Sequence, residues 1–428
     1  MVKIFNNKFY NDYSFLLIGF LLWGCSFTPI IPQGTVEGIQ PIWGTKLPGK
    51  AGNYNLGLVG LPIYNGNVLF HSTYFSSFSN NVMKEDNRIH GLDVETGEVK
   101  WTFPAEYSNL NSMCFDAVPY IFNNYLVTKM GKLGLFLETD KLLCINLDTH
   151  QLVWQKSMPS SISFTTSDDI VGKGQLFYFV QETLFESLIY EGNTLTGDTT
   201  LLLSIKPEAP LNNVEISSKQ LLYTTDGGND ILVFGTYEND YYSSSVPYRY
   251  FCIAFDIKSK TIIFKKEIQQ NEKYLLGQFE IIDNKVYMTS GRLATCLDLN
   301  TGDILWQFFS NEEYNYVAPR LSISDGVVFL YGENRFIGLD ALSGKKLYQG
   351  NTQCGKGCAS NGYAYIIGRD TKLYIIDIHN GSILHTITCP EKVTTGTGFV
   401  SGGIPQVHGD KLFVFGNYHA YCYDAIPK

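Results

Sequence analysis

Two pairs of adjacent carboxylates, Asp168-Asp169 and Glu312-Glu313, are the clearest candidates for acid–base chemistry in this sequence. Such a role requires one carboxyl group with a raised pKa, which burial or a neighbouring like charge can produce. Both pairs are expected in loops on a solvated surface. We therefore predict no catalytic role for either pair.

Other residue types add no signature of catalysis or metal binding. The seven histidines lack zinc-type spacing. The chain has neither a Gly-x-Ser-x-Gly nucleophile motif nor a Gly-rich phosphate loop. A formal net charge of −9 argues against nucleic acid, which requires a basic face. We expect a chain with no catalytic residue, no metal and no cofactor.

The cysteines are predicted to be structural. Cys144, Cys296 and Cys422 each lie two residues before an Asp or Asn that starts a turn, and small buried core positions suit them. Cys354 and Cys358 bracket a Gly-Lys-Gly segment. A local disulfide between these two is left open, because an oxidising compartment would permit it.

The N-terminus has the pattern of a targeting segment. Two lysines precede an apolar run over residues 15–23, which is too short to span a membrane and is typical of a secretory signal. The run ends in Leu-Trp-Gly before Cys25 and so resembles a bacterial lipoprotein signal, in which cleavage frees the cysteine for acylation. We predict a signal peptide over 1–24, lipidation of Cys25 and a tether over 25–40. An ordinary signal peptide is the alternative.

A short repeated phrase indicates the elements that must position these residues. Asp93 to Gly97 followed by Trp101, and Asp298 to Gly302 followed by Trp306, share the pattern Asx-x-x-Thr-Gly-x-x-x-Trp. Copies recur about every 40 to 50 residues, a period typical of repeat architectures. Weaker copies start at Asn146, Asn193, Asp256, Asp340, Asp377 and Asp424.

Each position of the phrase has a structural role. The Asx side chain starts a turn by bonding its own backbone two residues on, and the Thr does so more weakly. The glycine supplies the positive φ of a tight hairpin, and the large ring packs on a neighbouring sheet. His150 and Lys260 replace the glycine in two copies, so looser turns are expected there. The residues predicted to build the turns and their ring contacts are Asp93, Thr96, Gly97, Trp101, Asn146, Thr149, Trp154, Asp256, Asp298, Thr301, Gly302, Trp306, Asp340, Gly344, Asp377, Gly381, Asp424 and Trp43.

The segments that flank the turns alternate like β-strands and are rich in β-branched and aromatic residues. Four such strands per repeat, with no convincing helix, are typical of propeller blades. The copy at Asp424 lacks its outer strand, and the segment around Trp43 resembles the missing piece. We predict an all-β, eight-bladed propeller of four-stranded antiparallel blades over 41–428, closed by an N-terminal strand.

The phrase resembles the repeat signature of the pyrroloquinoline-quinone (PQQ)-type propellers, Ala-x-Asp-x-x-Thr-Gly-x-x-x-Trp, and Ala254 keeps its first alanine. The resemblance implies a fold rather than a chemistry. A quinone enzyme of that family would carry two adjacent cysteines, and a haem-bearing relative would carry Cys-x-x-Cys-His. Neither motif occurs here.

Repeat and lipid signal together resemble the BamB family of outer-membrane assembly factors. This resemblance implies a non-catalytic, lipid-anchored scaffold at the bacterial outer membrane, facing the periplasm. Its partner would be a protein of the outer-membrane assembly machinery. A PQQ-dependent dehydrogenase, or a surface lipoprotein that binds glycan or protein, are the alternatives.

Long connections between second and third strands are predicted in the first half of the chain, over Tyr74 to Arg88, Gly131 to Asp140 and Glu238 to Arg249. The corresponding connections in later repeats are short. Such loops emerge on one face of a propeller, and a mixture of Tyr, Ser and Asn favours recognition. The candidate binding residues are Tyr74, Phe75, Phe136, Tyr241, Tyr242 and Tyr248.

Overall fold

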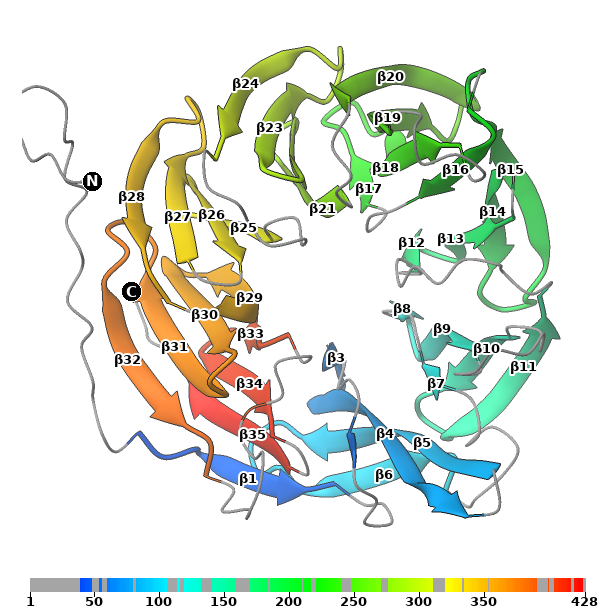
Figure 1. The fold of residues 1–428 in the computed structure, drawn as a ribbon. Coiled ribbons are helices and arrows are strands. Elements are labelled where there is room, and N and C mark those ends of the chain that lie inside the picture. Colours follow the sequence, from blue (N-terminus) through cyan, green and yellow to red (C-terminus); the bar gives the residue numbers. More distant parts are fainter. Residues whose placement is uncertain are drawn as a thin grey trace, which may run out of the picture.

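A computed structural model represents the protein, and eight antiparallel sheets follow one another around a central axis (Figure 1). The predicted eight-bladed, all-β propeller is confirmed. Within the described part of the chain no residue is helical, and no helix is long and apolar enough to cross a membrane. The structure describes residues 39–47, 54–55, 60–79, 82–105, 114–115, 119–131, 141–158, 170–183, 185–209, 211–216, 221–240, 248–270, 276–310, 320–332, 335–352, 354–390, 399, 404–416 and 419–425.

Blades 1 to 4 hold the first half of the chain, and their strands run from the axis outwards in chain order. Blade 1 comprises β2 (Tyr54–Asn55), β3 (Gly60–Tyr64), β4 (Asn67–Ser79), β5 (Val82–Asp93) and β6 (Val99–Phe103). Blade 2 comprises β7 (Cys114–Phe115), β8 (Tyr120–Phe122), β9 (Tyr125–Gly131), β10 (Lys141–Asn146) and β11 (Gln151–Ser157). Blade 3 comprises β12 (Val171–Lys173), β13 (Leu176–Glu182), β14 (Ser187–Asn193) and β15 (Thr199–Ile205). Blade 4 comprises β16 (Asn213–Ile216), β17 (Leu221–Thr224), β18 (Asp230–Asn239), β19 (Arg249–Asp256) and β20 (Thr261–Gln270).

Blades 5 to 8 are more regular and have four strands each in the described residues. Blade 5 comprises β21 (Leu276–Ile282), β22 (Lys285–Ser290), β23 (Leu293–Asp298) and β24 (Ile304–Phe309). Blade 6 comprises β25 (Arg320–Ser324), β26 (Val327–Gly332), β27 (Arg335–Asp340) and β28 (Lys346–Gly350). Blade 7 comprises β29 (Cys354–Ser360), β30 (Tyr363–Gly368), β31 (Lys372–Asp377) and β32 (Ile383–Thr388). Blade 8 comprises β33 (Gln406–His408), β34 (Lys411–Phe415), β35 (His419–Asp424) and, outermost, β1 (Trp43–Lys46).

The hydrophobic core is divided among the interfaces between blades. Each of eight apolar clusters lies between two adjacent sheets, because strand side chains alternate towards one neighbour and the other. Burying one such interface per blade is how a ring of repeats gains stability without a single large core.

In blades 1 to 7 the repeated turns join the third and fourth strands. In blade 1, Asp93 Oδ1 accepts hydrogen bonds from the backbone N–H groups of Glu95 (3.1 Å) and Thr96 (2.9 Å). These bonds to the charged form hold the pKa of the Asp93 carboxyl below its usual value, with the backbone bond from Thr96 the largest cause. The sequence predicted looser turns at His150 and Lys260, which replace the glycine. Both residues take its left-handed conformation, with φ of 56° and 55°.

The tryptophan at the end of the phrase donates a hydrogen bond to the turn of the next blade. The indole N–H of Trp154 donates to the carbonyl of Thr194 (2.8 Å), and that of Trp306 donates to Ala341 (3.0 Å). Each acceptor is the second residue of a turn phrase. The repeat therefore links neighbouring blades as well as shaping single turns.

Blade 8 takes its outer strand from the start of the described chain. β1 pairs antiparallel with β35, with Trp43 opposite Cys422. Trp43 is 8% exposed, and its indole N–H donates to the carbonyl of Val94 in blade 1 (2.9 Å). A Cβ on Gly97 would lie 2.5 Å from the Trp43 ring, so this turn needs glycine for space as well as for its φ of 71°.

Three blades depart from the four-stranded expectation. In blades 1, 2 and 4 the innermost position is divided between two short strands that pair with the same second strand. These extra strands are β2, β7 and β16, which pair with the far ends of β4, β9 and β18. The three blades are those in which long connections were predicted.

Candidate binding face

The two faces of the ring are built from different connections. We call the face with the repeated turns, which start at Asp93, Asn146, Asn193, Asp256, Asp298, Asp340 and Asp377, the turn face. The opposite face carries the connections between second and third strands, such as β4–β5 and β18–β19, and those that lead into the next blade. We call it the loop face.

Polar groups of the turn face are engaged in structure. Tyr64 of blade 1 donates to Asp148 of blade 2 (2.8 Å), and Lys173 of blade 3 pairs with Asp230 of blade 4 (2.7 Å). A shallow cleft of about 330 Å³ between blades 4 and 5 is lined by polar turn residues, including Asp226. The cleft is formed by the turns themselves.

Among the described strands, the second and third strands of blade 1 are the longest pair that extends on the loop face. β4 has 13 residues and β5 has 12, whereas β26 and β27 of blade 6 have 6 each. The pairing of β4 with β5 continues outwards to Ser79 opposite Val82. The segment predicted as a loop over Tyr74 to Arg88 is therefore a β-hairpin extension, in which Tyr74 and Phe75 pair with β2.

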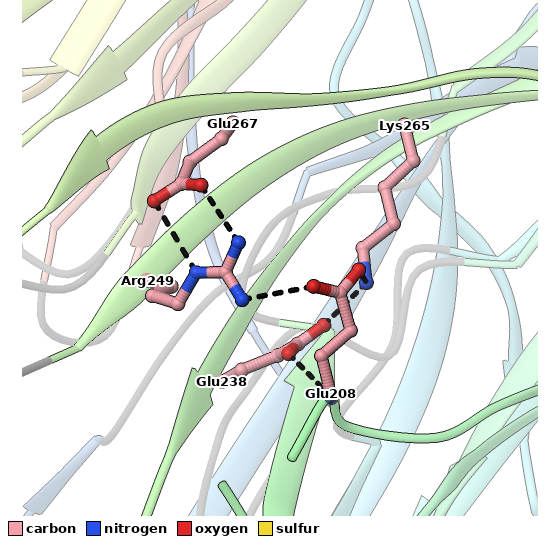
Figure 2. A network of polar contacts seen from close by, with 5 residues as sticks. All are labelled: Glu208, Glu238, Arg249, Lys265 and Glu267. Atoms are coloured by element: carbon pink, nitrogen blue, oxygen red, sulfur yellow. Dashed lines mark hydrogen bonds and ion pairs between the residues drawn. The ribbon is translucent and has the colours of Figure 1, made fainter. Parts of the chain in front are cut away.

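Blade 4 carries a charged network at its loop-face end (Figure 2). The side chain of Glu238 is fully buried, and its carboxylate accepts from Lys265 Nζ (2.6 Å) and from the backbone N–H of Glu208 (2.9 Å). Arg249 forms a two-pronged contact with Glu267, at 2.7 and 3.3 Å, and a third bond to Glu208 (2.9 Å). Lys265 also reaches Glu208 (2.9 Å), which joins all five residues.

The network fixes the segments that flank the β18–β19 connection. Glu238 lies near the end of β18 and Arg249 begins β19, so both sides of the connection are held by charged bonds. The two basic groups also lie over the Phe251 ring, Lys265 at 4.2 Å and Arg249 at 4.8 Å from its centre. Because both ends of the connection are held in place, the connection loses less conformational entropy when it binds a partner.

The charges in the network lower one pKa and raise another. Hydrogen bonds from Lys265 and then Arg249 hold the pKa of Glu208 below its usual value. Hydrogen bonding to Glu267 is the main cause that raises the pKa of Arg249. Both shifts favour the charged forms of Glu208 and Arg249, which the ion pair between them requires.

The predicted binding residues are only partly placed. Phe136, Tyr241 and Tyr242 lie outside the described residues, so their gathering into one patch stays a prediction. Tyr248 is half-buried beside Tyr237, at a ring separation of 6.3 Å, and packs on the cluster between blades 4 and 5. Figure 1 places blades 1, 2 and 4 in the same half of the ring.

Asp168, Asp169, Glu312 and Glu313 lie outside the described residues, as does Cys25. Within the described ranges no group of three or more His, Cys, Asp or Glu residues is arranged to hold a metal ion.

The described cysteines are free and structural. Cys354 and Cys358 are free thiols, so the disulfide left open by the sequence is not formed. Burial raises the pKa of Cys144 and Cys358 to about 12. Such thiols are poor nucleophiles at neutral pH. The sequence also lacks the adjacent cysteine pair expected above a quinone, so the residues present do not fit that cofactor site.

Comparisons with solved structures support the fold. BamB from Moraxella catarrhalis is 12% identical, with 91% of this chain and 100% of that chain covered and a TM-score of 0.56. A europium-containing methanol dehydrogenase is 11% identical, with 88% and 84% covered and a TM-score of 0.60. The computationally designed Ika8 protein is 13% identical, with 87% and 98% covered and a TM-score of 0.55.

No protein-family model and no curated protein sequence matches the chain. At these identities the structural likeness establishes the architecture alone. The chain is an eight-bladed propeller that resembles BamB and a methanol dehydrogenase in fold.

Proposed function

We propose that the protein is a non-catalytic scaffold that binds a protein partner through the extended blades of its loop face. One observation carries the proposal. The extra strands β2, β7 and β16 and the longest hairpin occur only in blades 1, 2 and 4 of the described chain, while the turn face is uniform. A propeller acquires specificity for a partner where its blades depart from the repeat. Here these departures are confined to the loop face in one half of the ring.

The hairpin of blade 1 indicates that the partner is a protein. β6 pairs with β5 only over Ile89 to Leu92, and in the described chain no strand pairs with the outer edge of β5 over residues 82–88. An exposed strand edge offers backbone donors and acceptors to an extended segment of another protein. The same edge would be a liability in a protein that bound nothing.

The cellular setting follows by analogy with BamB. The lipoprotein-like signal, acylation at Cys25 and the tether over 25–40 would attach the propeller to the outer membrane on its periplasmic side. The partner would then belong to the outer-membrane assembly machinery. Cys25→Ser should move the protein into the soluble envelope fraction, because acyl chains provide the attachment. Membrane retention of this variant in high salt would overturn the lipid anchor.

The proposed function is tested by capturing the partner. The full chain, lipid intact, is crosslinked in envelope membranes, and recovered proteins are identified with and without the residues 74–86 of the hairpin. Recovery of one partner by the wild type alone would support the scaffold. Equal recovery by both forms would reject the loop face as the binding surface.

A PQQ-dependent dehydrogenase is the competing function, favoured by the fold shared with methanol dehydrogenase. The purified protein is incubated with PQQ and Ca²⁺, and dye reduction with alcohols or sugars is measured. We expect no turnover and no saturable quinone binding. Cofactor-dependent dye reduction would replace the scaffold by an enzyme.

A further inference from the structure

We propose that Arg320 and Lys356 form a site for a small oxyanion, the phosphate or carboxylate group of a small molecule, beside the propeller axis. The site lies between blades 6 and 7, away from the extended blades, and does not depend on the scaffold function.

The two basic residues stand on neighbouring innermost strands. Arg320 begins β25, the innermost strand of blade 6, at its loop-face end, and Lys356 lies on β29, the innermost strand of blade 7. Figure 1 shows the two strands next to each other around the axis. Both side chains are half-buried.

A buried tyrosine connects the positions of the two basic residues. Tyr331 is directly opposite Arg320 in the pairing of β25 with β26. Its hydroxyl crosses to blade 7 and donates to the carbonyl of Gly357, next to Lys356 (2.7 Å). Tyr331 is fully buried, so it holds the strands that carry the two basic residues in a fixed relative position.

The backbone at Lys356 is shaped by an irregularity in the sheet. The register of β29 against β30 shifts between Cys354 and Gly357, so Lys356 lies in a bulge. Bulges re-aim side chains and are common beside functional sites. A Cβ on Gly357 would lie 2.2 Å from a side-chain atom of Ile366 and 2.6 Å from the carbonyl of Tyr365, so only glycine fits there.

Within the described residues the pair has no counter-charge. Across those ranges, neither the Arg320 side chain nor the Lys356 side chain has a hydrogen-bond or ion-pair partner. The carboxylate of Glu280 accepts from the backbone N–H of Ile323 on β25 (3.1 Å). Burial, and then the charge of Arg320, lowers the pKa of Lys356 to about 8, and burial lowers that of Arg320.

Two half-buried like charges that repel each other favour a bound anion. An oxyanion between them would accept from the planar guanidinium and from the ammonium group, and charge-assisted bonds of this kind are the strong ones. It would also relieve the repulsion that depresses the pKa of Lys356. Phosphate and carboxylate groups share this chemistry, so inorganic phosphate and acetate are the probes that separate them.

Binding to the full chain is measured by calorimetry with phosphate and, separately, acetate. We expect saturable binding of one anion per chain, weakened about tenfold or more in Arg320→Gln and in Lys356→Gln. Lys356→Arg, which keeps the charge, should retain binding. Lys258→Gln removes an exposed lysine on the turn face and should leave binding unchanged.

A second readout follows Lys356 itself and remains available if Arg320→Gln does not fold. The anion should slow acylation of Lys356 and raise its pKa, whereas acylation of Lys258 should not change. Absence of saturable binding by either probe, or equal binding by Lys356→Gln and Lys258→Gln, would overturn the site.

Discussion

Blade 6 and blade 1 are built from the same repeat, yet they agree at one end and differ at the other. On the turn face, Asp340 and Asp93 each accept hydrogen bonds from the residue three positions on, and each blade receives a ring of the preceding blade. On the loop face, the second and third strands have 6 residues each in blade 6 but 13 and 12 in blade 1.

The difference shows that contacts between blades constrain the sequence on the turn face more than on the loop face. The turn face is occupied by bonds that link one blade to the next, so a change there alters the ring. Connections on the loop face leave those bonds intact and are free to lengthen. The account therefore assigns stability to the turn face and recognition to the loop face of blades 1, 2 and 4.

The largest loss of stability is expected from Trp43→Ala. The change empties a buried site between blades 8 and 1 and removes the bond to Val94, so the free energy of unfolding should fall by about 3–5 kcal/mol. Urea unfolding measures the change. Ile42→Ala alters a neighbouring side chain that is 43% exposed and should cost under about 0.5 kcal/mol. Equal effects of the two would mean that Trp43 does not join the blades.

Lys265→Met should have the next largest effect and concerns the base of the blade 4 loop. It leaves the buried carboxylate of Glu238 without its cationic partner, which costs about 3 kcal/mol. Lys156→Met, which removes an exposed ion pair with Asp198, is the control and should cost under about 1 kcal/mol. If both changes cost the same, the network contributes no more than a surface ion pair.

The same network predicts a dependence on pH. The pKa of Glu208 is lowered in the folded protein, so its contribution is present above its ordinary pKa near 4.5 and is lost as the pH falls below that value. Lys265→Met removes the main cause of the lowering and should flatten the acid side of the stability curve. An unchanged curve would separate Glu208 from the network.

A smaller effect distinguishes two roles of glycine on the turn face. Gly97 and Gly66 both have a φ of 71°, but a Cβ at Gly97 would meet the Trp43 ring at 2.5 Å, whereas at Gly66 nothing lies within 4 Å. Gly66→Ala should therefore cost about 1 kcal/mol for backbone strain alone. Gly97→Ala should cost about 1–3 kcal/mol more through overpacking. Thermal unfolding of both variants tests this, and equal costs would remove the inter-blade role of the turn.

The repeat made the ring of blades predictable because its physics is local. Within nine residues, an Asx side chain and a glycine at fixed spacing predict a turn. The aromatic ring that follows them predicts a contact with a neighbouring sheet. The hairpin of blade 1 was predicted as a loop because a stretch rich in Ser and Asn is typical of loops. Its strand character comes from the pairing of β4 with β5 out to Ser79 opposite Val82, and the short strand β2 adds to it at Tyr74 and Phe75.

The candidate sites depend on longer-range contacts. Glu208 and Lys265 are 57 residues apart, and no local pattern marks them as partners. Arg320 and Lys356 likewise become neighbours only when blades 6 and 7 stand side by side. Single charged residues on separate blades carry no spacing signal, so such sites are found only in the folded ring.

The most direct test of the central claim shortens the blade 1 hairpin to the length of its counterparts in the regular blades. Residues 74–86 are replaced by Asn-Gly, a two-residue hairpin turn, which keeps Thr73 opposite Asn87. Lys372→Ala on the loop face of blade 7 is the matched control. Capture of the partner from envelope membranes should be lost with the shortened hairpin and kept with the control, while both proteins remain folded. Normal capture by the folded, shortened protein would contradict the account.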